Sequence, residues 1–90
     1  MTVRFTHVRL VGGVHHHHIA RLRAVSDGGQ TFDDTREAWV AFVESNNSGY
    51  VQDAYGNTAW VAVHTNGFTK WLQTYADGVW TDNLLALPRY

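Results

Sequence analysis

The sequence of 90 residues contains no cysteine, a single proline and no long apolar run. The absence of cysteine excludes a disulfide framework, a cysteine-based zinc site and a thiol nucleophile. No apolar run approaches the ~18 to 20 residues that a membrane-spanning helix needs, so no transmembrane segment and no membrane partner are predicted. The first residues alternate like a strand and lack the basic and apolar regions of a secretion signal, so we expect a cytoplasmic protein.

Charged side chains are also scarce, because Asp, Glu, Lys and Arg make up 17% of the chain, against about 25% in typical domains. The formal net charge of −1 gives little overall drive for binding nucleic acid. Hydrophobic residues reach 44% and aromatic residues 13%, which excludes an intrinsically disordered chain. A chain of this length supports one small core and not two, so residues 1–90 are predicted to form a single domain.

Several stretches have the composition of strands, namely residues 2–11, 18–25, 58–64 and 68–75, with a shorter candidate at 50–53. The first two are separated by a Gly-Gly pair and are expected to form an antiparallel hairpin. Asn66-Gly67 separates the two longest C-terminal stretches and predicts a second hairpin. In the first stretch, apolar side chains are divided between both faces, because Val3 and Phe5 have one parity and Val8 the other.

A helix of about three turns is predicted to begin at Asp34, which is a favourable N-cap. Glu37 stands three residues later, where the partner of a capping box belongs. Trp39, Phe42 and Val43 then follow at helical spacing and form one apolar stripe. The Asn-Asn-Ser-Gly run after Ser45 is expected to end the helix, since Asn and Gly tolerate the left-handed conformation.

Together these elements predict an α+β fold in the order β-β-α-β-β. An antiparallel sheet of four to five strands would have the single helix packed on one face. The other face would lack a covering layer unless the C-terminal residues reached it. If Val61 and Val63 pack beneath the helix, Trp60 and Trp71 lie on the uncovered face, and exposed aromatic patches of this kind usually mark a partner site.

The C-terminal residues contain an unusual run, Asp77-Gly78 followed by Asp82-Asn83-Leu84-Leu85-Ala86-Leu87-Pro88. With an aromatic strand just before it, this run resembles a family of small bacterial and phage proteins that is defined only as a domain of unknown function. The resemblance also includes Val8-Arg9, the Gly-Gly loop, the helix, and His16 and His18 before Ile19. Related branches place an acidic residue where this chain has His17. The resemblance implies a fold and no established activity, and its phage members suggest host proteins as partners.

The same run has a structural interpretation. Leu84, Leu85 and Leu87 would bury apolar surface, and Pro88 would stop a short helical turn. Burial of three leucines contributes on the order of 4 to 8 kcal/mol before the loss of conformational entropy is subtracted. This is comparable to the stability of a small domain. The tail is therefore predicted to be a clasp that holds the fold together, with a docking motif for a partner as the alternative.

Four consecutive histidines, His15–His18, are the candidate metal-binding feature. In an extended chain, His16 and His18 project to one side, and such a pair supplies two imidazole ligands to Zn²⁺ or Ni²⁺. A third ligand would have to come from elsewhere, such as His7 or His64. A surface loop with incidental metal affinity and a pH-responsive site are the alternatives. No other cofactor is predicted.

We expect a non-enzymatic protein-interaction module, because no motif that would place a nucleophile, a phosphate loop or paired carboxylates is present, and no small-molecule substrate is implied. The predicted contacts are Trp60, Trp71 and Tyr75, with Arg21 and Arg23 as charges at the rim. The partner would be a second copy, giving a homodimer, or a host protein. The alternatives are metal binding by the histidine run and, less favoured, binding of single-stranded nucleic acid by aromatic and basic side chains.

Overall fold

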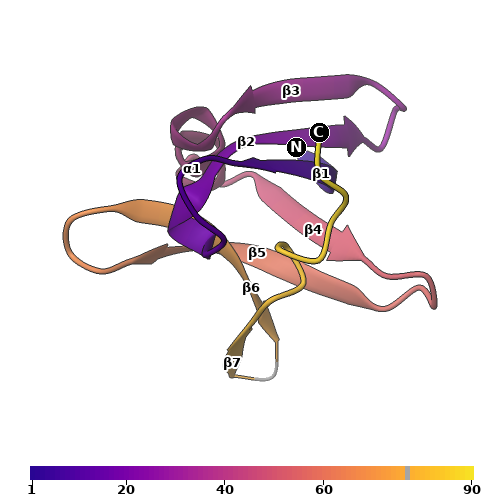
Figure 1. Cartoon of the computed structure of the whole chain (residues 1–90). Coiled ribbons are helices and arrows are strands. Elements are labelled where there is room, and N and C mark those ends of the chain that lie inside the picture. Colours follow the sequence, from indigo (N-terminus) through magenta and orange to yellow (C-terminus); the bar gives the residue numbers. More distant parts are fainter. Residues whose placement is uncertain (77) are drawn as a thin grey trace.

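The structure is a computed structural model that describes residues 1–76 and 78–90. These residues form one sheet of seven strands, one α-helix and one 3₁₀ helix, η1 (Figure 1). The elements in chain order are β1 (Thr2–Leu10), η1 (His16–His18), β2 (Ile19–Ser26), β3 (Thr31–Thr35), α1 (Arg36–Glu44), β4 (Ser48–Gln52), β5 (Thr58–Thr65), β6 (Lys70–Ala76) and β7 (Val79–Thr81). Asp77, half of the predicted Asp-Gly turn, lies outside the described residues.

The predicted α+β fold, with an antiparallel sheet of four to five strands in the order β-β-α-β-β, is wrong. The described residues are mostly sheet, and the strand order is β3-β2-β1-β4-β5-β6-β7. Neighbouring strands are antiparallel except β1 and β4, which are parallel. The parallel pair forms because the chain crosses over from β3 through α1 and returns beside β1. The prediction omitted β3, whose sequence TFDDT is polar, and β7, which spans three residues.

Helix α1 is present close to its predicted position. Its N-cap is Thr35 rather than Asp34, because the Thr35 hydroxyl accepts a hydrogen bond from the Ala38 amide at 3.2 Å. The Asp34 carboxylate instead accepts from the Thr35 amide at 2.8 Å. Beyond the helix, Asn46 has a φ of 66°, which is the left-handed conformation that commonly ends a helix.

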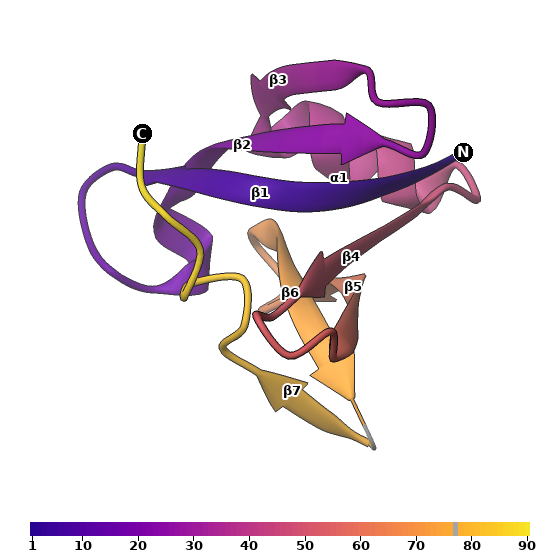
Figure 2. The ribbon, with the colours of Figure 1, turned by 90° about the vertical axis from the view of Figure 1, so that its right-hand side faces the viewer.

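The sheet is strongly bent, and α1 lies against the inner side of both of its halves, β1–β3 and β4–β7 (Figures 1 and 2). Trp39 anchors the helix there. Its indole Nε1 donates to the carbonyl of Leu22 at 2.9 Å, and its ring makes edge contacts with Phe5 and Phe42 at centroid distances of 5.0 and 5.2 Å. Val61 and Leu72, from the other half, belong to the same core.

A bulge in β1 resolves the mixed pattern of that strand. The register of β1 against β2 shifts between Phe5 and His7, so that Thr6 is an extra residue in β1. An extra residue reverses the parity of the strand that follows it. As a result, Val3, Phe5 and Val8 all point into the core and are at most 1% exposed. The expectation that Val8 lies opposite Val3 and Phe5 is therefore wrong.

The two halves of the sheet meet where Val3 of β1 pairs with Gly49 of β4. Gly49 is buried, and a Cβ atom at this position would overlap the ring of Phe5. A side chain at this position would therefore displace the Phe5 ring from its place in the core. Gly49 was expected only to end the helix, whereas the structure uses it to let backbone and aromatic ring approach closely.

Both predicted hairpins are confirmed by the antiparallel pairing of β1 with β2 and of β5 with β6. The second turn is a four-residue loop, since Thr65 and Lys70 are its flanking pair. The Asn66 side-chain oxygen accepts hydrogen bonds from the amides of Phe68 and Thr69, each at 2.9 Å. This local bonding closes the loop without the two-residue turn that Asn-Gly favours most.

The C-terminal tail, residues 82–90, fills the space where the two halves diverge. β1 pairs with β4 only through Thr2–Arg4. Farther along β1, the Val8 amide donates to the carbonyl of Pro88 at 3.0 Å, and Val8 forms a parallel bridge with Arg89. Leu84 is 0% exposed. The tail thus adds both backbone hydrogen bonds and a core side chain, as expected of a clasp.

Candidate interaction surface

Four aromatic side chains lie in a row on the outer face of the β4–β7 half. Tyr50, Trp60, Tyr75 and Trp80 are successive cross-strand partners on β4, β5, β6 and β7. We call this row the aromatic stripe. Trp60 is 52% and Tyr75 44% exposed. The buried residues Val61 of β5 and Leu72 of β6 have the opposite parity on their strands, so the stripe faces away from the helix.

Neighbouring rings of the stripe are not coplanar. The rings of Tyr50 and Trp60 are 5.4 Å apart with an interplanar angle of 56°, and those of Tyr75 and Trp80 are 4.9 Å apart at 70°. The tilted Tyr50–Trp60 pair and the edge-to-face Tyr75–Trp80 pair stabilise the sheet itself. They also give an uneven apolar surface, whereas successive bases or sugar rings stack best on rings that lie in one orientation.

Trp71, the third predicted contact, belongs to a neighbouring cluster around His64. The His64 ring stacks on Trp80 at 4.1 Å and 8°, and its centroid is 5.0 Å from that of Trp71. The side-chain oxygen of Gln73 lies 3.0 Å from His64 Nδ1 and accepts from the Trp71 indole at 3.2 Å. His17 approaches Trp71 at 5.9 Å. These contacts hold Trp71 half-buried at one end of the stripe.

The outer face of β4–β7 is free of Asp, Glu, Lys and Arg at the positions that the structure describes. These outward residues are Ser48, Tyr50, Gln52, Thr58, Trp60, Ala62, His64, Trp71, Gln73, Tyr75 and Trp80. The opposite, inward parity contains Lys70, whose ammonium pairs with Glu44 of α1 at 2.8 Å. The aromatic stripe is therefore an apolar and nearly uncharged surface.

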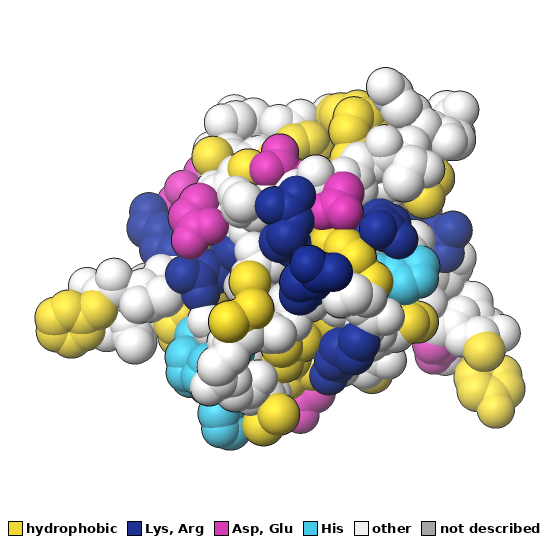
Figure 3. Space-filling view, turned by 45° about the horizontal axis from the view of Figure 1, so that its top comes forward, with side chains coloured by type: hydrophobic (Ala, Val, Ile, Leu, Met, Phe, Trp, Pro, Cys, Tyr) yellow, Lys and Arg dark blue, Asp and Glu magenta, His cyan; other side chains and the backbone are white. Residues whose placement is uncertain are grey.

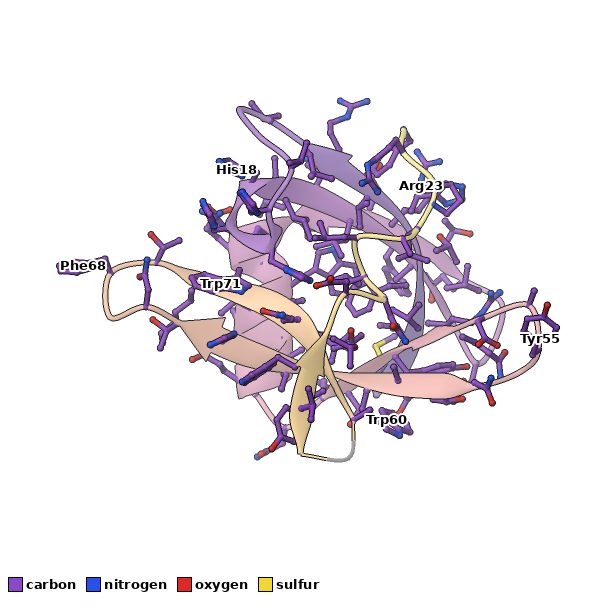
Figure 4. All side chains as sticks on the ribbon, turned by 60° about the horizontal axis from the view of Figure 1, so that its bottom comes forward. His18, Arg23, Tyr55, Trp60, Phe68 and Trp71 are labelled. Atoms are coloured by element: carbon purple, nitrogen blue, oxygen red, sulfur yellow. The ribbon has the colours of Figure 1, made fainter. Side chains whose placement is uncertain are left out.

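Two further aromatic side chains project from the loops at the ends of this half. Tyr55, in the β4–β5 loop, is 91% exposed, and Phe68, in the β5–β6 loop, is 96% exposed. Figure 4 shows them at opposite ends of the molecule. The β4–β5 loop is held by Asp53, whose carboxylate accepts from the amides of Tyr55 and Asn57; the hydrogen bonds from Asn57 lower the pKa of Asp53.

The structure does not bring Arg21 and Arg23 to the rim of the stripe. Both lie on β2, which is separated from β5 by β1 and β4, and Figure 4 shows Arg23 far from Trp60. Their guanidinium groups pair with Asp33 of β3 at 3.1 and 3.4 Å. The Tyr90 hydroxyl donates to the same carboxylate at 2.8 Å, and this bond together with the two arginines lowers the pKa of Asp33.

The histidine run is not extended, so the premise of the predicted metal pair is wrong. His16–His18 form the 3₁₀ helix η1, which turns successive side chains in different directions. His16 is buried, while His18 packs its ring over Gly13. Within residues 1–76 and 78–90, no three His, Asp or Glu side chains are grouped as metal ligands.

His16 is the buried titratable group of this region. Its Nε2 lies 4.0 Å from a carboxylate oxygen of Asp82 in the tail and makes no hydrogen bond to the described residues. Burial lowers the pKa of His16, and the Asp82 carboxylate opposes that shift. The imidazole therefore favours its neutral form in the folded protein.

The sequence predicted Trp60 and Trp71 on the uncovered face and Tyr75 as a further contact; the structure pairs Trp60 with Tyr75 and adds Tyr50 and Trp80, which the sequence did not indicate. Tyr50 lies in the short candidate strand at 50–53, and Trp80 follows the Asp-Gly turn. Cross-strand register alone joins these residues to the stripe. Tyr90 was missed as well, since nothing local indicates that the last residue reaches β3.

Comparison with known proteins gives one finding. The sequence model of the family described as "Protein of unknown function (DUF3892)" matches residues 4–88. Neither the curated proteins nor the solved structures include a match. The matched range contains all seven strands at least in part, the helix and most of the tail, and it confirms the resemblance to a domain of unknown function. No helix in the described part of the chain has the length and apolar character needed to cross a membrane.

Proposed function

The chain belongs to this family of unknown function, and we propose that it is a small protein-interaction module that forms a homodimer through its aromatic stripe. The proposal places it in the cytoplasm, which is the host cytoplasm if the gene is phage-encoded. The observation that supports it is the pairing of Trp60 with Tyr75, two large side chains that stay about half exposed on an uncharged sheet face. Aromatic residues are the side chains most enriched at the centres of protein interfaces.

The lack of charge favours a second copy as the partner. A two-fold interface places the same surface patch on both subunits, so any net charge on the patch would face its own copy. The stripe limits that repulsion, because its neutral rings and the surrounding Ser, Gln, Thr and Ala side chains can meet their equivalents, and Arg4 beside Tyr50 is the charged side chain at its edge. The exposed edges of the rings of one copy would insert between the rings of the other, since adjacent rings are tilted by 56° and 70°.

Sedimentation velocity over a range of protein concentrations tests the proposal. We expect a dimer for the natural chain and an increase of about 30-fold or more in the dimer dissociation constant for Trp60→Ser, because truncation of a central aromatic contact typically costs about 2 kcal/mol or more. Tyr55→Ser is the matched control, since it removes an exposed aromatic ring from a loop outside the stripe. A natural chain that stays monomeric at all concentrations would overturn the proposal, and so would equal effects of the two substitutions.

Native mass spectrometry complements this measurement. The spectrum gives the number of subunits and, at the same time, the number of Zn²⁺ or Ni²⁺ ions retained. His16 and His18 are the candidate ligands of such an ion. A stoichiometric metal on a monomer would favour the metal-binding alternative over the dimer. Monomers that capture a host protein through Trp60 would keep the stripe as a binding surface but replace the second copy with a different partner.

A further inference from the structure

Four arginines lie together on the outer face of the other half of the sheet. Arg4 and Arg9 come from β1, and Arg21 and Arg23 from β2. We call this group the arginine patch. The bulge at Thr6 keeps Arg4 and Arg9 on the same side of β1 although they are five positions apart. Figure 3 shows Lys and Arg side chains gathered on the face of the molecule that is turned toward the viewer.

The patch contains one directly opposed pair of like charges. Arg9 and Arg21 are direct cross-strand partners, and like charges placed opposite each other destabilise a sheet. Among the described residues, Asp33 is the acidic side chain that pairs with the patch. The patch thus contains four of the seven basic residues of a chain whose net charge is −1. Four arginines that share one acidic side chain give this face a positive excess, which attracts a negatively charged partner.

The patch also contains a planar aromatic ring. The guanidinium carbons of Arg23 and Arg9 lie 4.3 and 5.1 Å from the centroid of Tyr90. The imidazole of His7 meets the same ring edge-on at 6.1 Å, and the Tyr90 hydroxyl donates to Asp33. Guanidinium groups and aromatic rings in one surface are what a single-stranded nucleic acid requires, because its phosphates need cations and its unpaired bases need stacking partners.

We infer that the arginine patch, with Tyr90 and His7, binds single-stranded nucleic acid. Arg9, Arg21 and Arg23 contact the phosphates, and unpaired bases stack on the rings of Tyr90 and His7. An acidic peptide would use the charges but leave the rings unused, and a duplex keeps its bases stacked inside. The patch and the aromatic stripe are on different halves of the sheet and meet where Arg4 pairs with Tyr50. The side chains assigned to phosphates and bases lie on β1 beyond the bulge, on β2 and in the tail, so the inference does not depend on the proposed dimer.

Fluorescence anisotropy of a labelled oligothymidylate of about 12 nucleotides tests the inference. With three phosphate contacts, the logarithm of the association constant should fall with a slope of about −2 against the logarithm of salt concentration. This amounts to a loss of roughly 20-fold between about 50 and 200 mM salt. The double substitution Arg9→Gln and Arg23→Gln should reduce the slope to about −0.7 and weaken binding at 50 mM salt roughly tenfold.

Lys70→Gln is the matched control, because it removes one positive charge from the helix side of the sheet, where Lys70 pairs with Glu44. Its affinity and salt slope should equal those of the natural chain. Trp60→Ser should also leave oligonucleotide binding unchanged while it weakens the dimer, which separates this inference from the proposed function. A thermal melt followed by circular dichroism verifies that each variant is folded.

Several results would overturn the inference. One is the absence of binding by the natural chain at low salt, and another is binding that the double substitution leaves unchanged. Equal affinity for a duplex of the same charge would exclude the stacking role of Tyr90 and His7. Tighter binding of a labelled polyglutamate would assign the patch to an acidic protein. The comparisons of salt, duplex and polyglutamate use the natural chain and stay decisive if the double variant does not fold.

Discussion

The outer faces of the two halves of the sheet differ in their charge and in their contact with the C-terminal tail. On β1–β3, the outer face is charged, and the tail brings Tyr90 onto it through a hydrogen bond and two guanidinium contacts. On β4–β7, the outer face is uncharged, and Trp60 and Tyr75 stay about half exposed. One bent sheet around one core therefore presents two surfaces with different chemistry. The end of the tail lies on the outer face of only one of them.

The difference follows from where the halves separate. Strand β1 is paired with β4 only at Thr2–Arg4, so its far end would have free backbone groups. The tail supplies hydrogen-bonding partners for the backbone of β1 at Val8, and its last residues then continue along the β1–β3 face. On the other half, β5 and β6 pair along nearly their whole length and need no such segment. Backbone hydrogen bonding thus determines which face is covered.

The largest expected effect comes from breaking the clasp between the halves. Leu84→Ala should lower the free energy of unfolding by about 2 to 5 kcal/mol, because Leu84 is fully buried and the truncation leaves a cavity. Urea denaturation followed by circular dichroism measures the change. Leu85→Ala is the control, because this half-buried neighbour should cost clearly less. Equal losses would contradict the assignment of Leu84 as the core residue of the tail.

A smaller effect is expected where the tail ends on the charged half. Tyr90→Phe removes the hydrogen bond to Asp33 and should cost about 1 kcal/mol near neutral pH. The bond helps to depress the pKa of Asp33, so its contribution is present above the ordinary pKa of Asp and is lost as pH falls through the folded-state value. Urea titrations of both proteins at neutral and at acidic pH measure this loss. A cost that stays constant with pH would show that the ring, and not the bond, is responsible.

The smallest expected effect is a pH dependence at His16, which lies beside the tail. Burial lowers its pKa below the ordinary value, so the unfolded state binds more protons as pH falls below about 6.5. Stability should therefore decrease from neutral pH toward pH 5.5, and His16→Gln should flatten that decrease. The carboxylate of Asp82 opposes the shift, while His15, His17 and His64 add to it.

Melting temperatures recorded between about pH 5.5 and 7.5 test this prediction. His15→Gln is the control, because this exposed neighbour belongs to the same run of histidines. It should leave most of the pH dependence in place. If both substitutions flatten the curve equally, the effect belongs to the charge of the loop and not to the burial of His16.

Local sequence determined the elements whose hydrogen bonds are made within a few residues. The helix follows from its apolar spacing and from capping side chains near Asp34, although the cap itself is the next residue. The two hairpins follow from glycine-containing turns between strand-like stretches. The tail leucines were correctly interpreted as core-forming, since Leu84 is buried. In each case the decisive contacts are short in sequence or depend on apolar composition alone.

Tertiary structure decided the features that depend on strand neighbours. TFDDT becomes a strand because its backbone pairs with β2 from Thr31 to Thr35 and Phe32 packs against the core, while Asp33 meets the arginines of β2 on the outer face. The bulge at Thr6 reverses a parity that the sequence pattern alone leaves divided. The histidine run forms a 3₁₀ helix that packs against β6, a neighbour far away in the sequence.

The candidate sites also combine features that the sequence predicts with features that only the strand order determines. Sequence alone identified Trp60, Tyr75 and the two arginines of β2 as exposed outer residues, because alternation along a strand is a local property. Only the order of the strands decided that the aromatic residues and Arg21 and Arg23 lie on different halves. That order comes from the crossover through α1, which inserts β4 beside β1. The physical reason is that sheet neighbours are chosen by hydrogen bonds between segments far apart in the chain, and such bonds leave no periodic signal in the sequence.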